Sequence, residues 1–296
     1  MKLSSASLFV IPALIWGSTF FVIKFQLGVV DPTWSVSYRF ILAGIILLFY
    51  SRARQLNLQF SGREHFRIFL QGMLLFGFNY WFVYMAEQVL VSALVAITFS
   101  SIIFLNILFG KIFLKKVAEK KVYLGAILGV SGTVLLFYRE LAGIAFDDLP
   151  VFHLIVCFSA VMIASLGNIL SAHNQATKLP VIQTNAFGML YGGLTIGLVA
   201  AVTGVDISFD LGFSYVSSLL YLSIFGSIIA FGSYLTLIGK IGADKAGYVL
   251  IVIPVIAVGL SILFEGYQFG WQVFVGMLLI LGGNVMVLKR KALPAE

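Results

Sequence analysis

The sequence predicts an all-α membrane protein in which ten transmembrane helices form two inverted five-helix repeats. Of its 296 residues, 60% are hydrophobic and only 10% are charged, and the mean hydropathy is +1.05. A soluble domain carries about a quarter charged residues because its surface must be hydrated, so this surface is expected to face lipid. The apolar residues also gather in ten stretches, and parts of the two halves match each other.

Each predicted span is an apolar stretch close to the length of about 20 residues that a helix needs to cross a bilayer. The ten stretches cover residues 7–27, 34–50, 66–86, 89–110, 121–138, 150–172, 180–203, 213–238, 245–264 and 270–288. The connections are short, and the longest polar one runs from Ser51 to His65. No room remains for a soluble domain.

The basic residues predict the orientation. With a cytoplasmic N-terminus and ten spans, 16 of the 19 Lys and Arg residues fall on the cytoplasmic side, and only Arg139 falls outside. The positive-inside rule favours this arrangement, which implies a multi-pass inner-membrane protein with both termini in the cytoplasm. The net charge of +7 then reflects topology and contact with membrane lipid, and no nucleic acid partner is expected. The cytoplasmic set comprises Lys2, Arg52, Arg54, Arg63, Arg67, Lys111, Lys115, Lys116, Lys120, Lys121, Lys178, Lys240, Lys245, Lys289, Arg290 and Lys291.

Internal matches divide the chain into two predicted repeats, residues 1–145 and 146–296. Shifts of 148 and 151 residues superimpose prolines and glycines of spans two and five on those of spans seven and ten. An odd number of spans per half places the second copy upside down, and such inverted repeats underlie alternating access in many transporters. The matched pairs are Pro32 with Pro180, Gly44 with Gly192, Gly125 with Gly276, Gly132 with Gly283, and Val134 with Val285.

Enzymes, metal proteins and channels are disfavoured. Cys157 is the single cysteine, so no intramolecular disulfide is possible, and the three histidines do not form a metal-binding spacing with it. The sequence contains no HExxH or GxSxG motif and no paired acids, so no catalytic residue, cofactor or metal is predicted. Nothing resembles the filter or charged ring of a channel.

Two short motifs carry a family resemblance. The first span contains Ile15-Trp16-Gly17-Ser18-Thr19-Phe20, and Asp31-Pro32 and then Tyr38-Arg39-Phe40 follow it. The second half has Gly242-Ala243 before span nine, Glu265 after it, and Gly276 and Gly283 in span ten. This pattern resembles the EamA family of the drug/metabolite transporter superfamily. The first half departs from that pattern, with Leu114-Lys115-Lys116 at the place that corresponds to Glu265.

The resemblance implies export or exchange of amino acids and related metabolites. It also implies that spans one, three, four, six, eight and nine surround a central cavity, with spans five and ten outside it. A nucleotide-sugar or organophosphate exchanger on the same scaffold is the alternative, and it would need several cations around the cavity.

Fourteen polar or aromatic residues, all in these spans except Arg39 of span two, are candidates for binding a small-molecule substrate: Trp16, Thr19, Lys24, Arg39, Asn79, Tyr80, Tyr84, Ser100, Asn106, Ser165, Asn168, Ser227, Tyr234 and Tyr248. Amides and hydroxyls among aromatic walls suit a polar solute. Trp16 could stack on a substrate ring or be packed in the bundle, and Tyr84 could belong to an outer aromatic belt. Pro254, inside span nine, leaves the carbonyl of Leu250 without its helical donor, so it is a candidate hinge.

Two cations lie within or at the edge of spans, where a charge costs on the order of 3 kcal/mol. Lys24 and Arg39 could attract a carboxylate or phosphate near the outer end of the cavity. They could instead pair with Asp31 or Glu87 as structural contacts. His153, near the outer end of span six, could be a proton relay or a buried histidine.

The positions of the acidic residues limit the substrate class, and those of the glycines predict helix packing. Glu87 and Glu265 are expected at outer ends of spans, and no acid lies mid-span, which argues against cationic drugs and weakens proton coupling through a buried acid. A facilitator or exchanger of anionic or zwitterionic solutes fits better. Glycines of spans five and ten predict close helix packing within a monomer, or else a homodimer contact.

Overall fold

The computed structural model is helical throughout the part it describes, residues 4–115, 120–136, 149–241, 246, 248–266 and 270–288. These residues form no β-strand. Seven helical segments among them are long and apolar enough to cross a membrane, and Tyr123–Gly132 and Trp271–Gly283 are shorter apolar helices. The predicted all-α membrane character is confirmed.

The helices follow the apolar stretches in order. In the first half they are α1 (Ser5–Ile23) with the 3₁₀ turn η1 (Lys24–Gln26), α2 (Pro32–Ala53), α3 (Gly62–Gly72), η2 (Met73–Phe78), α4 (Asn79–Glu87), α5 (Ser92–Ser100), α6 (Ile102–Leu114) and α7 (Lys120–Leu136). In the second half they are α9 (Leu149–Ala176), α10 (Val181–Val202), α11 (Phe213–Tyr221), η3 (Leu222–Ile229), α12 (Ala230–Ile241), α14 (Tyr248–Phe264) and α15 (Trp271–Leu288).

Several helices begin before the apolar stretch that predicted them. Asp31 caps α2, its side chain accepting from the Thr33 amide at 2.8 Å, and Pro32 occupies the first helical position. Ser61 and Glu64 form a reciprocal capping box at the start of α3. The predicted starts at residues 34 and 66 were late because capping residues are polar and do not register as apolar sequence.

Two π-helical segments interrupt two of the long helical spans, and the sequence analysis did not predict them. Met73–Phe78 (η2) joins α3 to α4, and Leu222–Ile229 (η3) joins α11 to α12. A π-helical turn holds an extra residue, so it changes the face that the next turns present, and it is often found at functional sites. Hydropathy carries no signal for it, since the flanking residues are equally apolar.

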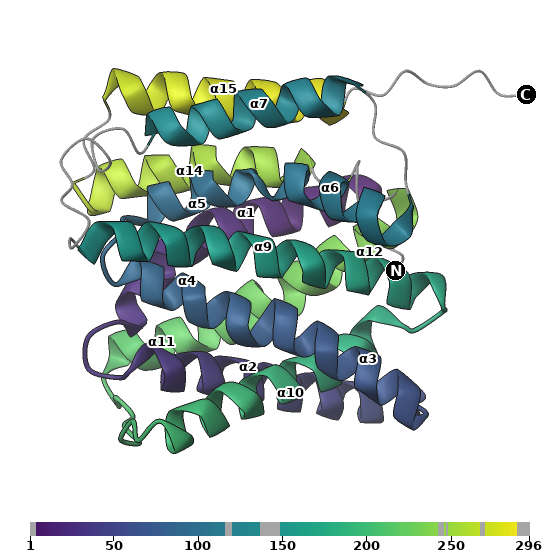
Figure 1. The fold of residues 1–296 in the computed structure, drawn as a ribbon. Coiled ribbons are helices and arrows are strands. Elements are labelled where there is room, and N and C mark those ends of the chain that lie inside the picture. Colours follow the sequence, from purple (N-terminus) through teal and green to yellow (C-terminus); the bar gives the residue numbers. More distant parts are fainter. Residues whose placement is uncertain are drawn as a thin grey trace, which may run out of the picture.

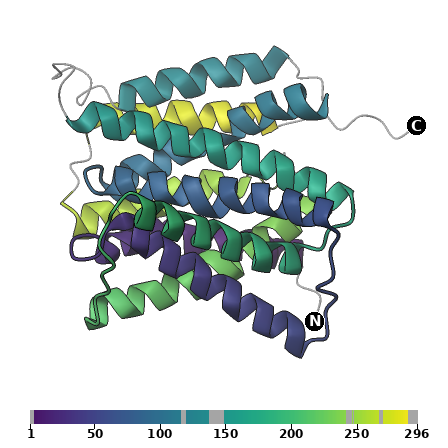
Figure 2. The same ribbon diagram turned by 60° about the horizontal axis from the view of Figure 1, so that its bottom comes forward.

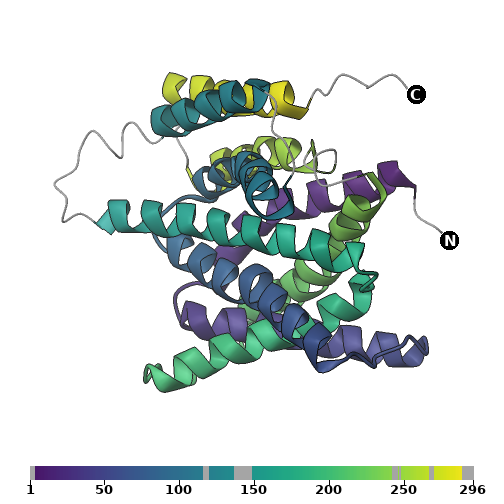
Figure 3. The same ribbon diagram turned by 45° about the vertical axis from the view of Figure 1, so that its right-hand side comes forward.

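The helices run side by side along a common direction, as the first two views show (Figures 1 and 2). The most extensive pairings are α2 with α10 and α7 with α15, followed by α1 and α5 with α14, and α4 and α6 with α9. The α7–α15 pair forms a layer at one edge of the bundle (Figures 1 and 3). Helix α1 begins and α15 ends on the same side of the molecule (Figures 1 and 3).

Glycines allow the backbones of α7 and α15 to touch. A Cβ atom added at Gly283 would lie 2.7 Å from the Gly125 carbonyl oxygen, and one added at Gly132 would lie 2.7 Å from that of Gly276. The predicted small-residue seams of spans five and ten therefore lie against each other within one chain. The same close approach occurs where Gly72 of α3 meets Gly188 of α10.

Some of the sequence predictions concern residues outside the part of the chain that the structure describes. They concern the topology residues Lys2, Lys116, Arg139, Lys245, Lys289, Arg290 and Lys291, and the motif residues Gly242 and Ala243.

Neighbouring glycines of α15 provide a matched test of the seam. We expect Gly283→Ala to lower the apparent melting temperature of the purified protein, because its methyl group meets the backbone of α7 and overpacking costs about 1–3 kcal/mol. Gly282→Ala should be neutral or stabilising, since nothing lies within 4 Å of its added Cβ and alanine is the better helix former. Equal melting temperatures for the two variants would contradict this packing.

Candidate functional site

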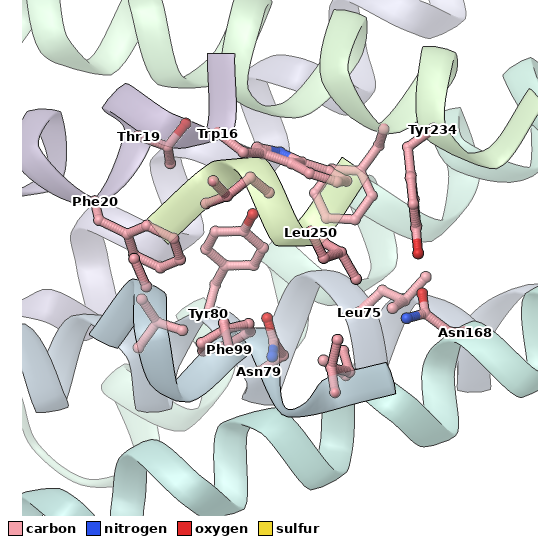
Figure 4. Close-up of a pocket in the computed structure, with 16 residues that line it drawn as sticks. Trp16, Thr19, Phe20, Leu75, Asn79, Tyr80, Phe99, Asn168, Tyr234 and Leu250 are labelled. Atoms are coloured by element: carbon pink, nitrogen blue, oxygen red, sulfur yellow. The ribbon is translucent and has the colours of Figure 1, made fainter. Parts of the chain in front are cut away.

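A cavity of about 70 Å³ lies in the middle of the bundle (Figure 4). This volume is several times the ~10–15 Å³ that one water molecule needs. Its wall consists of Trp16, Thr19, Phe20, Leu75, Asn79, Tyr80, Val83, Ala96, Phe99, Ile102, Ala164, Asn168, Phe231, Tyr234, Leu250 and Ile253. Helices from both halves of the chain therefore meet around one mostly apolar space with a few polar groups.

The helices that form this wall are α1, η2 with α4, α5 with α6, α9, α12 and α14. They correspond to spans one, three, four, six, eight and nine, the set that the family resemblance implies. Within the described part of the chain, α2, α7, α10 and α15 contribute no lining residue. These four helices pack behind the cavity-lining ones.

Trp16 is held in the wall by its indole group. Its Nε1 donates to the Gly226 carbonyl oxygen at 3.1 Å, inside the π-helical segment η3. Its ring meets those of Phe231 and Tyr234 edge-on, with centroids 4.9 and 5.1 Å away. Such edge-to-face pairs stabilise aromatic packing. The ring is therefore both packed and exposed to the cavity.

The polar groups of the wall differ in how far the protein satisfies them. The Asn79 amide nitrogen donates to the Ala160 carbonyl at 2.8 Å, and the Thr19 hydroxyl donates to that of Ile15 at 3.0 Å. The buried Tyr234 hydroxyl has no hydrogen-bond partner among the described residues. Figure 4 shows this hydroxyl and the amide of Asn168 at the same end of the cavity. That end has the capacity to bind a polar solute.

Arg39 lies behind the wall and is fully buried, with 0% of its surface exposed. Its Nε donates to the Ser227 hydroxyl at 3.0 Å and its Nη1 to that of Tyr84 at 3.4 Å, which in turn donates to Gln26 Oε1 at 2.7 Å. The guanidinium carbon is 4.4 Å from the centroid of the Tyr80 ring, a cation–π arrangement. One face of that ring thus contacts Arg39, while Tyr80 also lines the cavity.

Lys24 is bound to backbone carbonyls at the end of α4. Its ammonium group donates to the carbonyl oxygen of Glu87 and, at 2.6 Å, to that of Leu90. A cation at a helix C-terminus also interacts favourably with the helix dipole. Asp31, the other acid considered as its partner, caps α2 instead. Neither Lys24 nor Arg39 lines the cavity.

Six of the fourteen predicted residues line the cavity: Trp16, Thr19, Asn79, Tyr80, Asn168 and Tyr234. Three others, Arg39, Tyr84 and Ser227, form the buried cluster behind Tyr80. The Ser165 hydroxyl donates to Asn106 Oδ1 at 2.9 Å, and Ser100 bonds its own helix at Ile97, so these side chains turn away from the cavity.

Two further predicted positions lie in α14. The side chain of Tyr248 is outside the described part of the structure. Pro254 lies inside the helix and is buried, and Leu250, whose carbonyl lacks a helical donor because of the proline, lines the cavity.

Three kinds of residue at or near the site were missed. The aromatic walls include Phe20, Phe99 and Phe231, which the sequence could not separate from lipid-facing phenylalanines. Gln26 is buried in the Arg39 cluster although it lies at the very end of the first span. Glu87 does end its helix, as expected, but it is fully buried. The burial of a helix end depends on loops that pack over it, so local sequence gives no signal for it.

The sequence matches the EamA-like transporter family over residues 3–138 and again over residues 151–289. The chain belongs to this family. It is thus a multi-pass membrane protein of a transporter family, as the resemblance and the apolar helices predicted.

Similar proteins agree with this membership. The chain is 27% identical over 247 residues to the inner membrane transporter YedA of Escherichia coli (strain K12), covering 83% of this chain and 78% of the relative. It is 22% identical over 277 residues to the transporter YoaV of Bacillus subtilis (strain 168), with 92% of both chains covered. A protein of known crystal structure superimposes with a TM-score of 0.71 at 18% identity over 95% of both chains, which shows a shared fold.

Two buried tyrosines give a matched test of this site. We expect Tyr84→Phe to lower the apparent melting temperature, because the loss of its hydroxyl leaves Gln26 Oε1 and Arg39 Nη1 without the hydrogen bonds they make to it, at a cost of about 1–3 kcal/mol. Tyr234→Phe should leave it unchanged, since that hydroxyl has no partner to lose among the described residues. A destabilised Tyr234→Phe protein would mean that the hydroxyl has a structural role.

Proposed function

We propose that this protein exports or exchanges small metabolites, with amino acids or related zwitterions as substrates, by alternating access across the inner membrane. In this proposal ten helices span the bilayer as two inverted five-helix repeats, residues 1–145 and 146–296, with both termini in the cytoplasm. The cavity between the halves binds the solute. Its position among helices of both halves, with polar groups set into aromatic walls, is the observation that carries the proposal.

The arrangement of the helices supports inverted repeats. The π-helical segments η2 and η3 interrupt corresponding spans, the third and the eighth. Two sets of corresponding helices also pair with each other, α2 with α10 and α7 with α15, as helices close to a two-fold axis in the membrane plane would. The family match falls in two stretches, one in each proposed repeat. Helix α1 begins on the same side of the molecule on which α15 ends, and this fits an even number of spans.

The chemistry of the wall supports a small zwitterion. Its polar groups are uncharged amides, hydroxyls and an indole, and no Asp, Glu, Lys, Arg or His is among the described lining residues. Amide and hydroxyl groups can bind both the carboxylate and the ammonium of an amino acid. The apolar remainder of the wall suits a hydrophobic side chain.

A phosphate ester fits this cavity less well. A phosphate group is normally held by several cations or by amides at a helix N-terminus. Lys24 and Arg39 are the two cations near the cavity that the sequence suggested, and both donate their hydrogen bonds to protein groups. The proposal includes no catalytic step, and the relatives named above are transporters.

Flux through the purified protein tests the proposal. We expect proteoliposomes to exchange labelled amino acids in a saturable manner, and Asn168→Ala to reduce that exchange at least about tenfold, the loss expected for a contact of roughly 1.4 kcal/mol. Met162→Ala is the matched control, because Met162 is exposed on the same helix. Saturable exchange of phosphate esters in place of amino acids would overturn the substrate class.

Thiol labelling tests whether water reaches the cavity. In a Cys157→Ala background, which removes the single cysteine, we expect Asn168→Cys to react with a charged methanethiosulfonate. Met162→Cys should stay unmodified in a bilayer, since a thiol facing lipid does not form the reactive thiolate. Protection of Asn168→Cys by an amino acid would link the site to the solute. A cysteine that never reacts there would show a dry interior.

A further inference from the structure

Glu87 is a buried carboxyl group that the cavity alone does not explain. It is the last residue of α4, has 0% of its surface exposed, and neither of its side-chain oxygens has a hydrogen-bond partner among the described residues. An ionised carboxylate in such a place costs several kcal/mol unless charges or hydrogen bonds compensate it. A protonated carboxyl costs far less, so burial favours the neutral form.

Two cations lie near this carboxyl group, but neither donates a hydrogen bond to its oxygens. Lys24 of η1 donates to the backbone carbonyls of Glu87 and Leu90, and Arg39 of α2 donates to Ser227 and Tyr84. Both cations therefore lie close to the end of α4 that carries Glu87, and nearby positive charge favours an ionised carboxylate. The carboxyl therefore lies between opposing influences, burial on one side and two nearby cations on the other.

Other titratable groups surround it. Glu265, which follows α14, accepts from the Ser92 hydroxyl at 2.8 Å. Cys157 of α9 and Tyr84 of α4 are fully buried. His153, one turn before Cys157 on α9, is also buried. Neither side-chain oxygen of Glu87 takes part in a hydrogen bond among the described residues, so its carboxyl can accept a proton that enters this cluster.

The carboxyl is also connected to the cavity. Val83 lies one helical turn before Glu87 on α4 and lines the cavity, as does Tyr80. Tyr80 contacts the guanidinium of Arg39, which also donates to Tyr84 on the same helix as Glu87. A change of charge at Glu87 would therefore be felt by α4, which forms one wall of the cavity, and by Arg39, which lies behind that wall.

We propose that Glu87 is a proton-binding residue of the transport cycle, an inference that rests on the transport function proposed above. While this end of the bundle is closed and the other end is open, Glu87 binds a proton that arrives through the cavity from the opposite side of the membrane. When this end opens, water hydrates the group and the proton leaves to that water. Each cycle then carries one proton from one side of the membrane to the other, and solute movement is coupled to the pH gradient.

Infrared difference spectroscopy tests the proton site without any solute. We expect the protein in lipid nanodiscs to show a carboxylic-acid C=O band that shifts in D₂O and disappears as pH rises. Glu87→Gln should lack this band, whereas Glu265→Gln should keep it. Lys24→Met retains Glu87 and should move the midpoint of the titration to higher pH, which gives a second measurement should Glu87→Gln fail to fold. A band that survives in Glu87→Gln, or an unmoved midpoint in Lys24→Met, overturns the assignment.

Flux measurements test the coupling. In proteoliposomes given a labelled amino-acid mixture, we expect a pH gradient to drive accumulation in the wild type. The Glu87→Gln variant should lose this accumulation but still exchange labelled for unlabelled amino acids. Accumulation that ignores the pH gradient overturns the coupling. A wild-type protein that moves no amino acid at all contradicts the proposed substrate class, and the infrared titration still decides whether Glu87 holds the proton.

Discussion

Backbone polar groups cannot be left unsatisfied in contact with lipid, and this constraint governs where the chain can depart from a regular α-helix. The two π-helical segments and the proline of α14 are such departures, and each has residues buried by neighbouring helices, among them Phe76, Ser227 and Pro254. The carbonyl of Gly226 in η3 accepts from the Trp16 indole, and that of Leu222 accepts from the Ser227 hydroxyl. Irregular backbone therefore occurs close to the cavity, where side chains supply hydrogen bonds to it, Trp16 from another helix and Ser227 from η3 itself.

The same departures explain how one helix serves two neighbours. Before η2, Gly72 of α3 packs against the backbone of α10, and after it Asn79 and Tyr80 of α4 line the cavity. An extra residue in the turn between them changes which side of the helix faces inward. The η3 segment stands in the same relation to α12, which presents Phe231 and Tyr234 to the cavity.

Sequence alone predicted the helical membrane fold because bilayer thickness fixes span length and lipid fixes composition. It also identified polar candidates such as Trp16 and Asn168, since a polar group within a span needs a reason to be there. It could not separate Phe231 from a lipid-facing phenylalanine, because cavity and lipid are both apolar. It could not foresee the burial of Glu87 or Gln26, which depends on long-range packing between helix ends. The pairing of Asn106 with Ser165 was likewise invisible, since 59 residues separate them.

The position of α7 and α15 bears on what surrounds the cavity-lining helices. These two helices pack on each other along glycines, and an apolar cluster containing Leu94, Val258 and Ile280 joins α15 to α5 and α14. Along that edge α5 and α14 therefore have a protein neighbour in place of acyl chains. Acyl chains of the lipid are as apolar as most of the cavity wall, and this arrangement keeps them from entering the cavity from that direction.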